Sequence, residues 1–169
     1  ARIIISRFIN QLTIRRKLLA VFFRLITHTS SGKIYPVYAL LILFIIPEGI
    51  LITKIGLIAF AFQVPIYILS KNVIRRKRPS IINHGINQII NPPDRYSFPS
   101  GHCTSSMVFT LIINQYIPSL TIYFIVWMFI ILISRIALGL HYLSDTIFGV
   151  LLGLLSFYVT NQAVSIIFL

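Results

Sequence analysis

The sequence predicts an all-α fold: an integral-membrane helical bundle of five to six helices with an N-terminal amphipathic interfacial helix. Three observations support this class: 57% of the residues are hydrophobic, only 11% are charged, and the mean hydropathy is +0.90. Soluble domains carry about 25% charged residues, so this balance indicates that the solvent is a lipid bilayer. The 169 residues suit one domain, with residues 1–28 as the interfacial helix and residues 71–145 holding the chemical motifs.

The strong positive charge points to anionic lipid rather than to nucleic acid. The net charge is +12, from 15 Lys and Arg against 3 Asp and Glu. The basic residues lie between long apolar segments, and the sequence contains no recognisable nucleic-acid-binding module. We therefore expect no nucleic-acid partner, and we expect lipid headgroups and phosphate-bearing substrates instead. The sequence makes no prediction of oligomeric state.

Cysteines and acids are too few for the common metal sites. Cys103 is the single cysteine, so neither an intramolecular disulfide nor a cysteine zinc site can form. The acids Glu48, Asp94 and Asp145 are far apart in the sequence, which disfavours a carboxylate cage for Mg²⁺ or Ca²⁺. We expect no metal and no cofactor. The charged N-terminal segment also argues against a cleavable signal peptide.

Residues 1–28 predict a helix that lies on the membrane. The polar positions 2, 6, 10, 17, 24 and 28 recur at multiples of three and four residues, which traces one helical face. The cluster Arg15-Arg16-Lys17 in the middle makes a spanning helix costly, so we expect an interfacial helix. The alternative is a first membrane-spanning helix whose basic cluster is shielded by packing.

Five apolar segments follow, and they predict the membrane helices: residues 35–46, 55–69, 100–116, 120–138 and 141–169. The first two are shorter than the ~20 residues that cross a bilayer, but the apolar hairpin 50–52 allows either helix to extend. Gly149 and Gly153 form a G-x-x-x-G pair that permits close helix packing. The polar loop 71–100 and the turn 135–141 are expected on one face of the membrane, together with residues 28–33.

That face collects groups suited to holding a phosphate. Arg78 and Arg135 offer planar guanidinium forks and Lys71 offers a point charge. The segment Pro99-Ser100-Gly101-His102 opens a helix, where free backbone N–H groups and the positive end of the dipole favour an anion. Taken singly, a basic run is most often a topology anchor and Pro-Ser a common helix start. All of these on one predicted face indicate a site.

His141 and Asp145 suggest a nucleophile. They are four residues apart at the start of the last apolar segment, so a helix would place them on the same face. A carboxylate there would keep one ring nitrogen protonated and leave the other free to attack phosphorus. His102 is then the natural general acid for the leaving alkoxide. The simpler alternative is a hydrogen-bonded structural pair.

These motifs resemble the three-part signature of the type-2 phosphatidic acid phosphatase family, which shares its site with vanadium-dependent haloperoxidases and glucose-6-phosphatase. The matching segments are Lys71-x6-Arg78-Pro79, Pro99-Ser100-Gly101-His102, and Ser134-Arg135-x5-His141-x3-Asp145. Bacterial members usually have six spanning helices, whereas five and an interfacial helix are expected here. His28 and His84 match no motif and are interpreted as interfacial or loop residues.

The resemblance implies a metal-independent membrane phosphatase that works through a phosphohistidine. His141 would carry the phosphoryl group, Asp145 would orient it, and His102 would protonate the leaving group. Five residues would bind the phosphate and stabilise the transition state: Lys71, Arg78, Ser100, Gly101 and Arg135. A lipid phosphotransferase using the same phosphohistidine, a vanadate-dependent oxidase, and a non-catalytic membrane protein that retains the motif are the alternatives.

Relatives of this kind act on undecaprenyl pyrophosphate, phosphatidylglycerol phosphate, phosphatidate or lipid A phosphate, and the sequence does not choose among them. The additional cations Arg75, Arg76 and Lys77 suggest the hypothesis of a pyrophosphate or a multiply charged headgroup. The resemblance implies the bacterial inner (cytoplasmic) membrane with the site on its periplasmic face. The excess of Lys and Arg on the catalytic face would favour the cytoplasmic side instead.

Overall fold

All regular elements of the described residues are helices, which confirms the predicted all-α class. The computed structural model describes residues 2–82, 85–92 and 94–168. The elements are α1 (Arg2–Arg15), α2 (Lys17–His28), α3 (Tyr35–Ile45), α4 (Gly49–Ile74), α5 (Gly101–Tyr116), the short 3₁₀ helix η1 (Pro118–Leu120), α6 (Thr121–Ala137) and α7 (Leu143–Phe168). The five predicted membrane segments correspond to α3–α7. α4 is longer than its apolar segment because it continues into the hairpin and includes Lys71.

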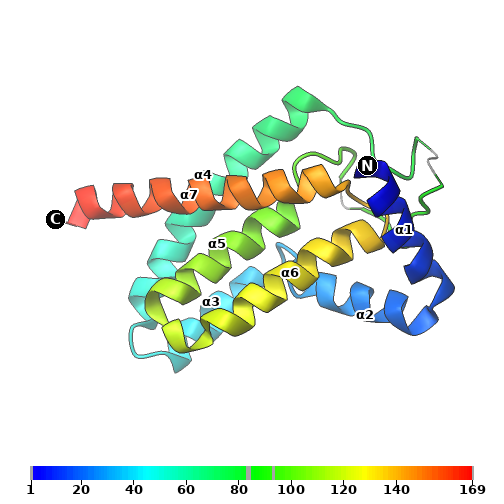
Figure 1. Ribbon diagram of the computed structural model, residues 1–169. Coiled ribbons are helices and arrows are strands. Elements are labelled where there is room, and N and C mark those ends of the chain that lie inside the picture. The colour runs from blue at the N-terminus through cyan, green and yellow to red at the C-terminus, as the bar shows by residue number, and fades with distance from the viewer. Residues whose placement is uncertain (1, 83–84, 93, 169) are drawn as a thin grey trace.

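α5 is the central helix of the bundle, with α4, α6 and α7 packed around it (Figure 1). Its buried residues include Cys103, Thr104 and Val108. The predicted close packing of small residues is confirmed against this helix, because a Cβ atom added at Gly149 would lie 2.6 Å from the Ser100 carbonyl oxygen. At Gly153 the added atom would lie 2.7 Å from the Thr104 carbonyl oxygen. The two glycines therefore hold α7 directly against the start of α5.

Within the part of the chain that the structure describes, three helical segments are long and apolar enough to cross a membrane: Gly49–Ile74, Pro118–Ala137 and Leu143–Ser165. α3 is apolar but has only 11 residues. Large apolar side chains on the outside of these helices are exposed, among them Leu57 at 63% and Ile122 at 62%. Exposed apolar faces on long helices need a lipid solvent, and the chain is an integral membrane protein.

The N-terminal segment differs from the single helix predicted for residues 1–28. It forms two helices, α1 and α2, because Arg16 between them has an extended backbone with φ −119° and ψ 95°. The polar side of α1 also faces the protein: Ser6, Asn10 and Thr13 are buried, whereas Ile4 and Phe8 are 71% and 68% exposed. The spacing of the polar residues identifies one face of the helix. It does not tell whether the polar side chains on that face form hydrogen bonds to water or to buried backbone groups.

Asn10 shows why the polar side faces inward. Its Nδ2 donates to the carbonyl oxygens of Asn87 at 2.9 Å and Ala137 at 2.8 Å. Its Oδ1 accepts from the backbone N–H of Asn87 at 2.9 Å. One buried side chain therefore joins the loop after α4 to the end of α6, and Figure 1 shows α1 beside that loop. This arrangement brings the predicted motifs to one end of the bundle.

Candidate active site

A cavity of about 210 Å³ lies where the three motifs meet. Five of the eight predicted site residues line it, and the remaining lining residues come from the segment between α2 and α3, from α4, from the loop after α4 and from α5. The predicted residues are Lys71, Gly101, His102, Arg135 and His141, and the others are Ser30, Gly32, Gln63, Val64, Tyr67, Asp94 and Ser105. The other three predicted residues do not line the cavity themselves but are bound to residues around it; they are Arg78, Ser100 and Asp145.

His141 lies in the turn between α6 and α7 and is only 2% exposed. Its Nδ1 lies 2.6 Å from the carbonyl oxygen of Ser97. A carbonyl only accepts hydrogen bonds, so Nδ1 carries the proton and Nε2 keeps a free lone pair. Nε2 faces the guanidinium of Arg135, with 3.5 Å between Nε2 and Nη2. The imidazole is therefore held in one tautomer with its nucleophilic nitrogen beside a cation.

The surroundings of His141 keep the ring neutral. Burial lowers the pKa of His141 well below the usual 6.5, and the positive charge of Arg135 lowers it further. The hydrogen bond to Ser97 acts in the opposite direction but is outweighed. A neutral imidazole is the form that can attack phosphorus.

Asp145 does not make the hydrogen bond to His141 that the spacing suggested. Its Oδ2 is 3.9 Å from His141 Nδ1 and instead accepts the backbone N–H of Tyr142 at 3.0 Å. The reason is that α7 begins at Leu143, so His141 lies in the preceding turn and not on the same helical face. Asp145 thus satisfies a free N–H at the start of α7, as acidic residues in a first helical turn commonly do.

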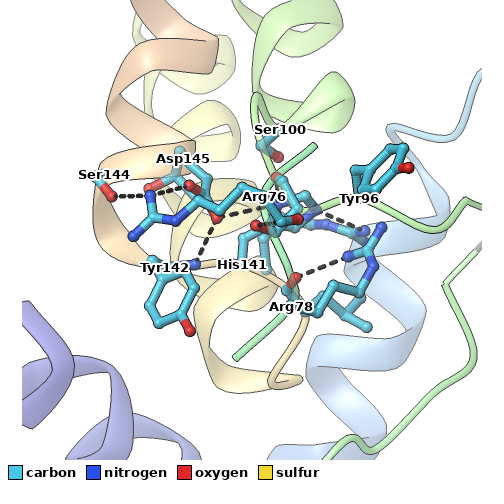
Figure 2. A network of polar contacts seen from close by, with 12 residues as sticks. Arg76, Arg78, Tyr96, Ser100, His141, Tyr142, Ser144 and Asp145 are labelled. Atoms are coloured by element: carbon cyan, nitrogen blue, oxygen red, sulfur yellow. Dashed lines mark hydrogen bonds and ion pairs between the residues drawn. The ribbon is translucent and has the colours of Figure 1, made fainter. Parts of the chain in front are cut away.

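Arg76 holds the other oxygen of Asp145 (Figure 2). Its Nη1 is 2.6 Å from Asp145 Oδ1 and 2.7 Å from the hydroxyl of Ser144. The guanidinium also lies over the ring of Tyr142, 4.2 Å from its centroid. Arg76 is therefore part of the framework behind His141, and neither it nor its neighbours Arg75 and Lys77 line the cavity.

Arg135 and Ser100 carry donors that a ligand could use. Arg135 is 2% exposed, and its Nη1 donates to the Thr27 hydroxyl at 2.8 Å. Among the described residues, Arg135 Nε and Ser100 Oγ are buried side-chain atoms without a hydrogen-bond partner. Unsatisfied buried donors cost roughly 1–3 kcal/mol each and are rare in native proteins. Arg135 lines the cavity, so an unpaired donor of its guanidinium lies beside it.

The start of α5 supplies further donors. Ser100 is the residue before the helix and forms no side-chain cap, and its backbone N–H donates to the carbonyl oxygen of Asp145 at 3.0 Å. Gly101 and His102 at the first turn line the cavity. A Cβ atom at Gly101 would lie 2.8 Å from the ring of Tyr67, so a larger residue at the helix start would force Tyr67 to move. First-turn N–H groups favour an anion at this position.

Lys71 and Arg78 share a residue that the sequence reasoning missed. Asp94 Oδ1 accepts from Lys71 Nζ, and from Arg78 Nη2 at 2.6 Å. Burial raises the pKa of Asp94, but the hydrogen bond and charge of Lys71 outweigh it, so the pKa falls below 3.8. Asp94 is one of three acids in the chain and follows a basic run, which was the available signal. The Ser97 carbonyl offered no signal in the sequence, because every residue has a backbone carbonyl.

Of the two histidines outside the motifs, the structure describes only His28, which does not line the cavity. His28 is exposed at the end of α2, in keeping with its interpretation as an interfacial residue. His84 lies outside the described residues.

Fold and site together define an α-helical membrane protein with a cavity at one end that is lined by Lys71 and Arg135. Two solved structures share this architecture. LpxE of Aquifex aeolicus is 24% identical with a TM-score of 0.82, and the match covers 94% of this chain and 93% of LpxE. The PAP2-type phosphatidylglycerolphosphate phosphatase of Bacillus subtilis is 23% identical with a TM-score of 0.74, and the match covers 95% of this chain and 84% of that enzyme. At these identities the likeness concerns the fold.

The chain belongs to the PAP2 superfamily, whose family model matches residues 50–167. This confirms the resemblance to type-2 phosphatidic acid phosphatases. The decaprenylphosphoryl-5-phosphoribose phosphatase of Mycobacterium tuberculosis is 36% identical over 97 residues, which are 52% of this chain and 48% of that protein. The Mycolicibacterium smegmatis enzyme of the same name is 34% identical over 91 residues, 48% and 43% respectively. The chain spans about half the length of these curated relatives.

Proposed function

We propose that the protein is a membrane lipid phosphatase that transfers the phosphoryl group of its substrate to Nε2 of His141 and then to water. The observation that carries this proposal is the state of His141: its Nδ1 is bound to the Ser97 carbonyl, and its unprotonated Nε2 faces Arg135 in a cavity lined by cations. The curated relatives are named as phosphatases, which supports the same reaction class. The proposed chemistry uses no metal and no cofactor.

The first step forms a P–N bond and breaks the P–O bond to the lipid alcohol. The phosphate lies among Lys71, Arg78 and Arg135, and the Gly101 N–H together with the unpaired Ser100 hydroxyl completes the cradle. These cations stabilise charge that develops on the equatorial oxygens. His102 lines the same cavity and gives its proton to the leaving alkoxide. The charge of the incoming dianion offsets the surrounding cations, which favours the protonated form of His102 before transfer.

The second step reverses the proton transfer. His102, now neutral, accepts a proton from a water molecule, and the resulting hydroxide attacks the phosphohistidine. The P–N bond breaks, inorganic phosphate leaves, and His141 returns to its neutral state. Asp145 acts behind the site by fixing the start of α7 and the backbone of Tyr142, so we assign it a positioning role.

The lipid nature of the substrate is supported by an apolar groove of about 540 Å³ between α3, α4 and α5. Gly32 lines both this groove and the catalytic cavity. Tyr35, another residue of the groove, is hydrogen-bonded at 3.1 Å to Ser30, which lines the cavity. A substrate with its phosphate in the cavity thus has an adjoining apolar surface for an acyl or prenyl chain.

The test compares His141→Ala with His28→Ala on a panel of lipid phosphates in detergent micelles. Removal of the nucleophile should lower phosphate release by about a thousandfold or more. The control removes an exposed histidine and should change little. Brief incubation with a ³²P-labelled substrate should give an acid-labile, base-stable label on the parent that is missing from His141→Ala. Unchanged turnover in that variant would remove the mechanism.

We further propose that the site faces the periplasm from the inner membrane. Asn87 is exposed in the loop after α4, and the native Cys103 is buried, so an Asn87→Cys variant offers one reactive thiol with little background. A membrane-impermeant maleimide should label it in intact cells. Labelling only after the cells are opened would place the site in the cytoplasm.

A further inference from the structure

Asp94 is an anion built into the phosphate cavity. Its Oδ1 contacts the two cations Lys71 and Arg78, and its Oδ2 accepts the hydroxyl of Tyr67 at 3.0 Å. The side chains of Lys71 and Arg78 are only 8% and 2% exposed, while that of Asp94 is 32% exposed. Since Asp94 lines the cavity, any phosphate that enters must bind beside this carboxylate.

The contacts of Asp94 leave room for a phosphate. Arg78 uses Nε and Nη2 on Asp94 and one Nη1 donor on the Leu140 carbonyl, so a second N–H on Nη1 stays available. Lys71 donates to Asp94 and to the Tyr96 carbonyl, which leaves one of its N–H groups. Arg135 has its Nε unpaired. Lys71 and Arg135, which line the cavity, therefore keep a donor for a phosphate without displacing Asp94, and Arg78 keeps one beside them.

Asp94 also sets the charge of the cavity. Three cations, Lys71, Arg78 and Arg135, are gathered around the cavity against this one carboxylate, because Asp145 is paired with Arg76 behind it. While His102 is neutral, before it takes up the proton for the leaving group, the excess of two positive charges matches a phosphomonoester, which carries up to about two negative charges near neutral pH. A diphosphate ester brings an additional negative charge to the same place. Arg75, Arg76 and Lys77 are not in the lining and offer it no partner.

We propose that Asp94 is a specificity-determining residue that matches the site to lipid phosphomonoesters and disfavours lipid diphosphates. The inference rests on the proposed phosphatase function and deepens it by choosing between the two substrate classes. It replaces the hypothesis that surplus cations in the loop favour a pyrophosphate, because Arg76 is committed to Asp145.

The test uses Asp94→Asn and two substrates with identical acyl chains, phosphatidate and diacylglycerol diphosphate. For each protein the measured quantity is the ratio of kcat/KM on the diphosphate to kcat/KM on the monophosphate. The ratio cancels the fraction of correctly folded enzyme. It should be below one in the parent and rise about tenfold in Asp94→Asn, a moderate effect because solvent reaches the carboxylate. The control Asp94→Glu keeps the charge and should keep the preference.

A binding experiment separates this inference from the phosphatase proposal. Calorimetric titration in detergent with inorganic phosphate and with pyrophosphate needs no turnover. The parent should prefer phosphate, and Asp94→Asn should shift the preference toward pyrophosphate. A ratio that stays constant or falls in Asp94→Asn, or a parent that prefers diphosphates, overturns the role of Asp94. A parent that shows this binding preference but releases phosphate from neither lipid overturns the phosphatase function and leaves the charge matching intact.

Discussion

Arg76 and Asp145 form an ion pair that joins the loop after α4 to the first turn of α7, with 2.6 Å between Nη1 and Oδ1 (Figure 2). The carboxylate is fully buried and the guanidinium is 37% exposed. His141 lies between these two segments and is bound to the loop through Ser97. The ion pair therefore fixes the two walls that hold the nucleophile, although neither of its members contacts Nε2.

Arg76→Gln should destabilise the protein and slow the reaction. The substitution leaves a buried carboxylate with less compensation, at a cost of about 1–2 kcal/mol; the exposure of Arg76 keeps this below the value for a fully buried pair. Denaturation in detergent measures this cost, and kcat should fall about tenfold with KM little changed. The control is Lys77→Gln at the exposed neighbouring position, and it should alter neither the stability nor kcat.

Asp145→Asn should be less harmful than His141→Ala. An amide oxygen can still accept the Tyr142 N–H, and the tautomer of His141 is set by the Ser97 carbonyl. We expect kcat to fall about 10–100-fold, against the thousandfold or greater loss for the nucleophile. Steady-state kinetics of the two variants on one lipid phosphate makes the comparison. Equal losses would assign Asp145 a direct part in activating His141.

The sequence correctly predicted several of the residues that gather at the candidate active site. It was less successful in predicting which of them form hydrogen bonds to one another. Membrane helices alternate in direction and place their ends on two faces of the membrane. For this reason the positions of the motifs along the chain were enough to predict that Lys71, Arg135 and His141 meet, and they line one cavity. His141 and Asp145 do lie close together, at 3.9 Å, but the predicted hydrogen bond between them is not formed, because it required the helix to begin two residues earlier than it does. Helix boundaries are the least certain part of any prediction from sequence.

Contacts between distant segments were the other limit. Asn10 binds Asn87 and Ala137 across more than 70 residues, and periodicity within α1 cannot reveal such partners. The same holds for Asp94, whose partners lie before it in α4 and the following loop. By contrast, the packing at Gly149 depends on a local pattern of small residues and was predicted.

Gly149→Ala should loosen the junction of α5 and α7. The new Cβ would lie 2.6 Å from the Ser100 carbonyl oxygen, so the helices must move apart, at about 1–3 kcal/mol. Because Ser100 directly precedes α5, whose first turn lines the cavity, activity should fall as well. Gly56→Ala in α4 is the matched control: its nearest neighbour would be a side-chain atom at 3.9 Å, and alanine there should be neutral or stabilising by up to about 1 kcal/mol.

His141 should remain neutral at pH values where an ordinary histidine is protonated. Its pKa lies well below 6.5 because of burial and the nearby cations, whereas the unfolded chain titrates near 6.5. Below that pH the unfolded state binds the extra proton, so stability should fall as the pH falls through this range. Spectra of ¹⁵N-histidine-labelled protein, with the signal assigned by its loss in His141→Ala, should show the Nδ1–H tautomer down to below pH 6.5. A cationic ring at pH 6.5 would contradict the description of the site.

Asn10→Ala should release the catalytic loop from α1. The substitution leaves the Asn87 N–H and the Ala137 carbonyl without their side-chain partner, and each unsatisfied buried group costs about 1–3 kcal/mol. Hydrogen exchange of the Asn87 amide should accelerate by at least about tenfold. KM for a lipid phosphate should rise, because Arg78, Asp94 and Ser97 all belong to the loosened loop. Gln11→Ala, one position further along α1, should leave both readings unchanged; matching effects of the two variants would mean that α1 as a whole, and not this side chain, holds the loop.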